Sequence, residues 1–183
     1  LPLLLEAVEA WTVGDPVDPG TRMGPLVSAD HREAVARYLE SGMGDPDSGP
    51  VVPAFSGRVP AGPGFWFPPT VVAPAGADWR LAREEIFGPV LAVIPFGDEE
   101  DAVRMANATP YGLSGSIWTR DGARALRMAR AVDSGNLSVN SNSSVRVQTA
   151  FGGRKQSGLG RELGLEALDS YTEVKTVFVS DSG

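Results

Sequence analysis

Short apolar runs alternate with amphipathic segments through the middle of this 183-residue chain. The run at 89–96, PVLAVIPF, is almost continuously apolar, which is typical of a parallel strand buried on both faces. Further strands are predicted at 114–119 and 136–140, and the helices between them are predicted to begin after Asp98 and at residue 121. This alternation favours an α/β fold with a mostly parallel open sheet and flanking helices.

The flanking regions add further elements. Two amphipathic helices are predicted near the start, one from Leu1 to about Trp11 and one capped by Ser28 and closed by Gly42 and Gly44. A short helix through about Leu168, and extended segments, are expected at the following places: 51–55, 66–73 and 172–179. The last of these segments alternates in polarity and is predicted to be a terminal strand that needs a pairing partner.

Composition narrows the classes of function. The net charge of −7 argues against a general nucleic-acid partner and against a membrane surface. The chain has no cysteine, so it holds no disulfide, thiolate metal site or cysteine nucleophile, and its one histidine, His31, excludes a multi-histidine metal site. No apolar run approaches the roughly 18 residues that cross a bilayer, so a cytoplasmic protein is expected. His31 falls in the first turn of a helix and is expected to be a surface residue.

The stretch FGGRKQSGLGRELG at 151–164 concentrates five glycines and three cations. It does not match the phosphate-binding loop, because Lys155 lies between Arg154 and Gln156. It does not match the dinucleotide fingerprint either, because Leu163 stands where the third glycine is required. The pattern by itself leaves open a turn before a helix, a ligand loop or an interface.

Two motifs in register carry a resemblance to a known family. EEIFGPV occupies 84–90, and Asn140 is followed after ten residues by the glycine stretch, which YTEVKT closes at 171–176. With DPVDPGTRMGPLVS upstream and NATPYGLSGSIWT between them, the chain resembles the C-terminal part of the NAD(P)-dependent aldehyde dehydrogenase family, from Leu1 to about Val179. The resemblance implies a catalytic-domain portion at 1–170 and an oligomerisation strand with its tail at 171–183.

The resemblance implies oxidation of a small-molecule aldehyde to a carboxylic acid, with NAD or NADP as cofactor. In the family, the cysteine nucleophile, the general-base glutamate and the dinucleotide-binding domain all precede the region that this chain resembles. We therefore expect no catalytic residue in the chain, no activity from it alone, and weak or no cofactor binding. The alternative is a non-catalytic assembly or binding module that kept the fold. Reading the gene upstream separates the two, because a cysteine and a glutamate at family positions favour the enzyme and a native start codon favours the module.

By family position, Glu85 accepts hydrogen bonds from both hydroxyls of the nicotinamide ribose, and Phe87 lies beside the nicotinamide ring. A carboxylate suits the first task because its two oxygens take two donors, and a flat apolar ring suits the second because it excludes water. From the residues alone, Glu85 reads as a surface glutamate before a buried strand, and the alternative for Phe87 is a phenylalanine packed in the core. Glu84 is expected to face solvent, since adjacent residues of an extended chain point oppositely.

The substrate tunnel and the subunit interface are also implied by family position. Phe151 lines the aldehyde tunnel unless it packs in the core, and the loop at 141–150 borders it with small residues: Ser143, Ser144 and Val145. These small residues suggest a wide tunnel entrance with polar walls. Ala150 stands where the family commonly has a proline before the phenylalanine, and a proline would stiffen the approach to Phe151. An ion pair of Arg161 with Glu173 is expected near the interface of a homo-oligomer, a dimer or tetramer, and the alternative is two independent surface charges.

Overall fold

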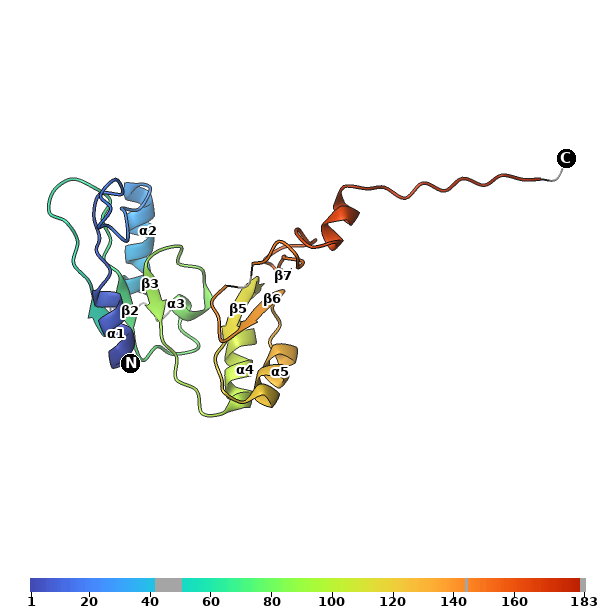
Figure 1. Ribbon diagram of the computed structural model, residues 1–183. Coiled ribbons are helices and arrows are strands. Elements are labelled where there is room, and N and C mark those ends of the chain that lie inside the picture. Colours follow the sequence, from blue (N-terminus) through green and yellow to red (C-terminus); the bar gives the residue numbers. More distant parts are fainter. Residues whose placement is uncertain (42–50, 144, 182–183) are drawn as a thin grey trace. The chain divides into compact units, whose positions relative to one another are not determined.

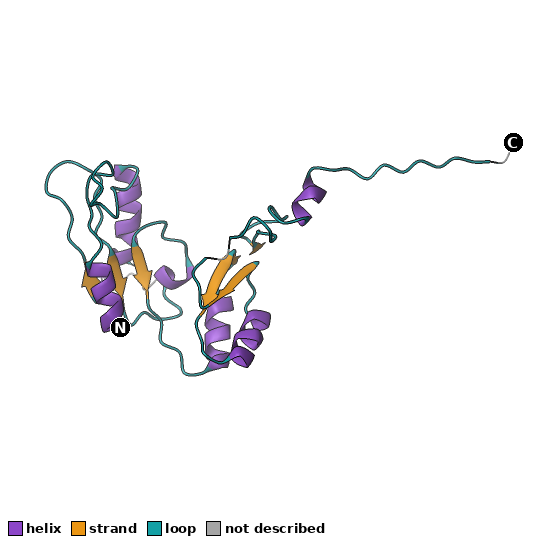
Figure 2. Ribbon diagram, in the orientation of Figure 1, coloured by secondary structure: helices purple, strands orange, loops and turns teal. Residues whose placement is uncertain are grey.

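The computed structural model describes residues 1–41, 51–143 and 145–181. The chain divides into two compact units, Leu1–Gly97 and Asp98–Gly183. Both units contain helices and short strands (Figure 2). The α/β class predicted from the sequence is confirmed, with open sheets in each unit.

The first unit is built around a three-stranded sheet of order β1-β2-β3 (Figure 1). Strand β2 pairs antiparallel with β1 and parallel with β3, with Val71 opposite Leu91 in the parallel pair. The elements of this unit, in chain order, are α1 (Pro2–Glu9), α2 (Ala29–Glu40), β1 (Phe55–Ser56), β2 (Thr70–Val72), α3 (Arg80–Arg83) and β3 (Val90–Ala92).

The core of the first unit lies where helices α2 and α3 meet this sheet. Val72 and Leu81 are buried there, and Tyr38 and Leu39 of α2 pack against them. Helix α2 begins where the sequence predicts, because the Ser28 hydroxyl accepts a hydrogen bond from the backbone N–H of His31 at 3.1 Å. The predicted closing glycines of this helix, Gly42 and Gly44, lie outside the described residues.

The second unit contains a parallel pair, β5-β6, and an antiparallel pair, β4-β7. Its elements are α4 (Glu99–Asn107), β4 (Tyr111–Gly112), β5 (Ser114–Ile117), α5 (Gly122–Ala131), β6 (Asn136–Val139), β7 (Arg154–Lys155) and a 3-10 helix (Glu166–Ser170). Asp98 and Asp121 cap α4 and α5 with their carboxylates, so both helices begin where the sequence predicts. The strand–helix–strand connection from β5 through α5 to β6 is the parallel unit predicted from the alternation of the sequence.

The structure and the sequence expectations differ at two segments. The apolar run 89–96 forms a strand of only three residues, β3, and Leu91 in it is 45% exposed, because it points away from the core against which Val90 and Ala92 pack. The segment 172–179 forms no strand within the single chain, and Val174 in it is fully exposed. Its assignment as a strand that pairs between subunits stays a prediction. A strand needs a neighbour for its backbone ladder, and no described residue pairs with this segment.

Across the described ranges, no helix combines the length and the apolar character needed to cross a membrane.

Candidate cofactor and substrate sites

The EEIFGPV turn, residues 84–90, connects α3 to β3 in the first unit. At its apex Phe87 adopts a φ of 55°, a left-handed conformation that is unfavourable for a residue with a Cβ atom. Gly88 follows, and a Cβ built there would lie 2.6 Å from Val35 Cγ2 on helix α2. The carbonyl of Pro89 accepts the backbone N–H of Thr70 at 2.8 Å, which joins the end of the turn to β2. Glycine therefore lets the turn lie directly against α2.

Glu84, the first residue of the turn, is only half exposed and is engaged by two side chains. Its Oε2 accepts hydrogen bonds from the Tyr38 hydroxyl at 3.0 Å and from Arg80 Nε at 2.9 Å. The Arg80 guanidinium also lies 4.4 Å from the centroid of the Tyr38 ring. Partial burial, followed by the adjacent Glu84 carboxylate, raises the pKa of the Tyr38 hydroxyl. Glu84 is thus a structural anchor of the turn as well as a partly solvent-facing residue.

Glu85 and Phe87, the two predicted cofactor residues, are both presented to solvent. Glu85 is exposed, and its carboxylate makes no hydrogen bond or ion pair with the described residues. The side chain of Phe87 is 74% exposed, which rules out the alternative of a core phenylalanine within this chain. The structure therefore leaves an acceptor and an aromatic face available in one turn.

His31 is the residue of this region that the sequence analysis misjudged. It is half buried, and its Nε2–H donates to the carbonyl oxygen of Phe87 at 2.7 Å. The two rings lie 6.0 Å apart between centroids. The spacing His31, Val35, Tyr38 (i, i+4, i+7) marks one face of α2, and all three side chains meet the turn. This helical spacing was the sequence signal that could have placed His31 on the packed face of α2.

The glycine loop at 151–164 in the second unit is held mainly through backbone groups. Phe151 and Glu162 exchange two backbone hydrogen bonds, of 2.7 and 2.8 Å, which close the loop. Asn136, only 8% exposed, donates from Nδ2 to the carbonyls of Leu113 and Gly152, each at 2.9 Å. A Cβ at Gly135 would overlap the Gly152 carbonyl oxygen, so the backbone just before β6 is in direct contact with the loop.

The three cations of the loop all bind groups within the second unit. Arg154 pairs with Asp133 at 3.0 Å, and Lys155 Nζ donates to the carbonyl of Thr109 at 2.8 Å. Arg161 Nη1 donates to the carbonyls of Gly153 and Gly160, at 2.9 and 2.7 Å. These contacts give each of the three cations a structural partner within the same unit.

The expected ion pair between Arg161 and Glu173 is not formed. Arg161 is occupied by the loop carbonyls, and Glu173 is exposed and makes no hydrogen bond or ion pair with the described residues. The prediction paired charges along the sequence and overlooked backbone carbonyls as acceptors. The assignment of both residues to a subunit interface stays a prediction.

The predicted tunnel residues lie in and beside the loop that precedes Phe151. Phe151 is half buried, and Ser143 and Val145 are exposed. Ser143 Oγ accepts a hydrogen bond from Arg146 Nη1 at 2.7 Å. Ser144 lies outside the described residues. The assignment of these residues to an aldehyde tunnel stays a prediction.

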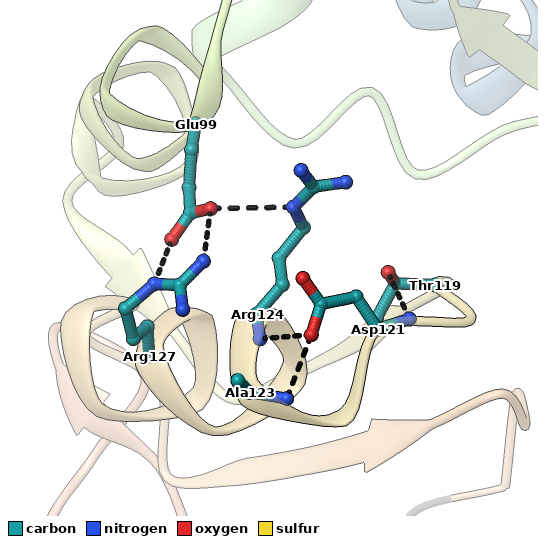
Figure 3. A network of polar contacts seen from close by, with 6 residues as sticks. All are labelled: Glu99, Thr119, Asp121, Ala123, Arg124 and Arg127. Atoms are coloured by element: carbon teal, nitrogen blue, oxygen red, sulfur yellow. Dashed lines mark hydrogen bonds and ion pairs between the residues drawn. The ribbon is translucent and has the colours of Figure 1, made fainter.

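A charged network that the sequence analysis did not identify joins helices α4 and α5 (Figure 3). Arg127 binds Glu99 with two hydrogen bonds of 2.9 Å, and Arg124 Nε lies 3.3 Å from Glu99 Oε2. The hydrogen bond from Arg127 is the main cause that lowers the pKa of Glu99. The backbone N–H of Arg124, in turn, lowers the pKa of the capping residue Asp121. The network fixes the helix that connects the parallel strands β5 and β6.

Comparison with known proteins decides the family. A sequence model of the aldehyde dehydrogenase family matches residues 1–177. The chain belongs to the aldehyde dehydrogenase family. Its relatives include a betaine aldehyde dehydrogenase of Rhizobium leguminosarum bv. trifolii, 44% identical over 174 residues and covering 93% of this chain and 35% of the relative. A geranial dehydrogenase of Castellaniella defragrans is 40% identical over 173 residues, covering 94% of this chain and 35% of the relative.

Solved structures of aldehyde dehydrogenases share the fold. Betaine aldehyde dehydrogenase from Staphylococcus aureus in complex with NAD+ superposes with a TM-score of 0.83 at 33% identity, covering 93% of this chain and 34% of that one. An aldehyde dehydrogenase mutant from Bacillus cereus gives a TM-score of 0.88 at 36% identity, covering 97% of this chain and 35% of that one. The chain thus spans about a third of the length of the aldehyde dehydrogenases it matches.

Proposed function

We propose that this chain supplies the nicotinamide-contacting turn and part of the substrate path of an NAD(P)-dependent aldehyde dehydrogenase. The observation that carries the proposal is the difference between two adjacent carboxylates. Glu84 is engaged by Tyr38 and Arg80, whereas Glu85 is exposed and has no partner among the described residues. An unpaired acceptor near an exposed aromatic ring suits a ligand that brings hydroxyl donors and a flat ring.

The chemistry of the turn fits the proposed cofactor. The Glu85 carboxylate has two oxygens and four lone-pair sites, enough to accept hydrogen bonds from both ribose hydroxyls. Phe87 offers an apolar face that limits where a nicotinamide ring can lie and keeps water from it. When bound, NAD(P)+ accepts a hydride from the substrate. In this proposal, the residues of the turn bind and orient, and they transfer no proton.

The nucleophile of the reaction is supplied outside the residues described here. The chain contains no cysteine, and the family's thiolate, general base and dinucleotide-binding domain belong to the region that precedes the part this chain matches. The chain by itself therefore oxidises no aldehyde by the family mechanism and binds cofactor weakly or not at all. The activity belongs to the product of the complete gene.

The substrate proposed for that product is a polar or bulky aldehyde. Small side chains border the path near Phe151, where Ser143 and Val145 are both exposed. The names of two relatives, betaine aldehyde dehydrogenase and geranial dehydrogenase, supply a cationic and an apolar aldehyde to compare. Replacing Ser143 or Val145 with Phe in the product of the complete gene should change the ratio of kcat/KM for these two aldehydes. An unchanged ratio would contradict the assignment of these residues to the substrate path.

The terminal segment 171–181 is proposed to complete a sheet with a second copy of the chain. Its apolar side chains are all exposed: Tyr171, Val174, Val177, Phe178 and Val179. Exposed apolar residues with unpaired backbone groups are typical of a strand that pairs between subunits. The mass of the assembled product, measured by light scattering, tests this directly, and a monomer would contradict it.

The decisive experiment replaces the two adjacent glutamates in turn, in the product of the complete gene. Glu85→Ala is expected to raise the Kd for NAD+ about 10- to 150-fold, because a hydrogen bond to a charged group contributes about 1.5–3 kcal/mol. Glu84→Ala is the matched control, since it removes a neighbouring carboxylate that is already engaged by Tyr38 and Arg80. Calorimetry or NADH fluorescence gives the Kd values.

The outcomes separate the proposal from its rival. A Kd that rises equally in both variants would show that the turn is only being destabilised. A wild-type product that binds neither NAD+ nor NADP+ and shows no turnover would favour the non-catalytic module.

A further inference from the structure

We propose that His31 is the positioning residue that holds the Phe87 peptide in its left-handed conformation, and so presents Phe87 and Glu85 to the cofactor. This inference rests on the cofactor contacts proposed above. It assigns a role to a residue on helix α2, which is 56 positions away from Phe87 in the sequence.

The conformation of Phe87 needs a cause outside the turn itself. A φ of 55° brings the Cβ atom close to backbone atoms, and an aromatic residue without a constraint favours other conformations. The ring of Phe87 is 74% exposed, so packing of the side chain does not enforce this geometry. The constraint must therefore act on the backbone.

His31 acts on that backbone directly. A carbonyl oxygen only accepts, so the hydrogen bond of 2.7 Å requires a proton on Nε2 of His31. The other ring nitrogen, Nδ1, is buried and has no partner among the described residues. Burying a polar atom without a partner is unfavourable, and the hydrogen bond that the ring gains in this position is the one to Phe87. The imidazole thus directs its Nε2–H at the apex of the turn.

The base of the His31 side chain is also fixed. Its backbone N–H is bound by the capping hydroxyl of Ser28 at 3.1 Å, in the first turn of α2. Further along the same face, Val35 packs against Gly88, and Tyr38 binds Glu84. These two contacts hold the flanks of the turn, whereas His31 alone of the three binds the Phe87 peptide. Loss of His31 therefore frees the apex and leaves the flanks attached.

The test compares two replacements of similar length that differ in one donor. His31→Gln keeps an N–H donor, and His31→Met has none. In the product of the complete gene, we expect His31→Met to raise the Kd for NAD+ about three- to tenfold, as for the loss of one neutral hydrogen bond, with the KM for aldehyde unchanged. We expect His31→Gln to stay within about twofold of the wild type. Tyr38→Phe, which removes a flanking hydrogen bond on the same helix, should lower stability and leave the Kd unchanged.

A second measurement reads the turn without activity. In NMR spectra of the 183-residue chain, a left-handed residue gives a strong NOE between its own amide and α protons. This signal of Phe87 should persist in the wild type and in His31→Gln, and should weaken in His31→Met. A wild-type NOE and a wild-type Kd in His31→Met would overturn the inference, as would equal losses in both replacements.

The failure of the inference differs from the failure of the proposed function. If Glu85→Ala and Phe87→Ala both leave the Kd for NAD+ unchanged, the cofactor contacts are wrong, whatever His31 does to the NOE. If those variants weaken binding and His31→Met does not, the contacts stand and the positioning role is wrong.

Discussion

The EEIFGPV turn of the first unit and the glycine loop of the second are fixed in opposite ways. The apex of the turn is held by one side-chain hydrogen bond, from His31, and the side chains proposed to contact the cofactor face solvent. The glycine loop is bound through the carbonyls of Gly152, Gly153 and Gly160, and all three of its cations have partners. The glycine loop, which has more glycines and cations in the sequence, therefore uses these residues to hold the fold.

The difference between occupied and free side chains indicates which of the two regions can bind a ligand through its side chains. A side chain that is committed inside the fold has no free donor or acceptor for a ligand. Arg161 illustrates this in the loop, where its guanidinium binds two carbonyls. Glu85 illustrates the opposite in the turn, because its neighbour Glu84 makes the structural contacts. The density of glycines and cations drew attention to the loop, but the unpaired carboxylate of the turn is the better sign of binding.

The largest loss of stability is expected where the backbone packs most tightly against the glycine loop, at Gly135. Gly135→Ala places a Cβ where it overlaps the Gly152 carbonyl oxygen, and backbone on both sides has little freedom to move. We expect the free energy of unfolding to fall by about 3 kcal/mol or more, at the upper end for overpacking. Urea denaturation followed by circular dichroism measures it.

Gly122→Ala is the matched control for that loss. Gly122 has open space around its Cβ position and begins helix α5, so alanine there should be neutral or stabilising by up to about 1 kcal/mol. Equal losses in the two variants would show that the contact between Gly135 and the loop is not tight.

A smaller effect is expected in the turn. Gly88→Ala would place a Cβ 2.6 Å from Val35 Cγ2, which belongs to a side chain rather than to backbone. We expect a loss of about 1–2 kcal/mol, since the valine has some freedom to adjust. In the double variant with Val35→Ala the two losses should be less than additive, because the clash is removed. Simple additivity in denaturation experiments would contradict the proposed contact between α2 and the turn.

The smallest expected effect concerns the charged network of the second unit. The folded-state pKa of Glu99 lies below its unfolded value, mainly because of the hydrogen bond from Arg127. The stabilisation is therefore fully present above the unfolded pKa of a glutamate, about 4.3, and is lost as the pH falls through the lower folded-state pKa. The melting temperature of wild type should fall more steeply than that of Glu99→Gln on acidification below about pH 4.5. The difference should shrink at about 1 M salt, where exposed charges are screened. Parallel curves would exclude a contribution from this network.

Much of the local structure was predictable because its causes are local. Ser28, Asp98 and Asp121 cap the helices that follow them, and a cap depends on residues two or three positions away. The parallel pair of β5 and β6 follows from the strand–helix–strand alternation. The motif around Glu85 likewise located the exposed turn, through the family resemblance.

The remaining features depend on partners far away in the sequence. His31 acts on a carbonyl 56 positions away, and Asn136 acts on carbonyls 16 and 23 positions away. Carbonyl acceptors are present at every residue, so charge patterns such as that of Arg161 and Glu173 do not reveal which acceptor is used. The run 89–96 was apolar enough for a buried strand, but exposure also depends on neighbouring strands that a sequence pattern does not specify.

The three contacts of helix α2 with the turn also limit how the length of this helix can change during evolution. His31, Val35 and Tyr38 share one face only because they are separated by four and three residues. An insertion of one residue after His31 would rotate the rest of the helix by about 100° relative to it, since an α-helix has 3.6 residues per turn. One inserted codon would thus separate the contact at the apex from the two at the flanks, whereas conservative substitutions elsewhere on the helix would preserve all three.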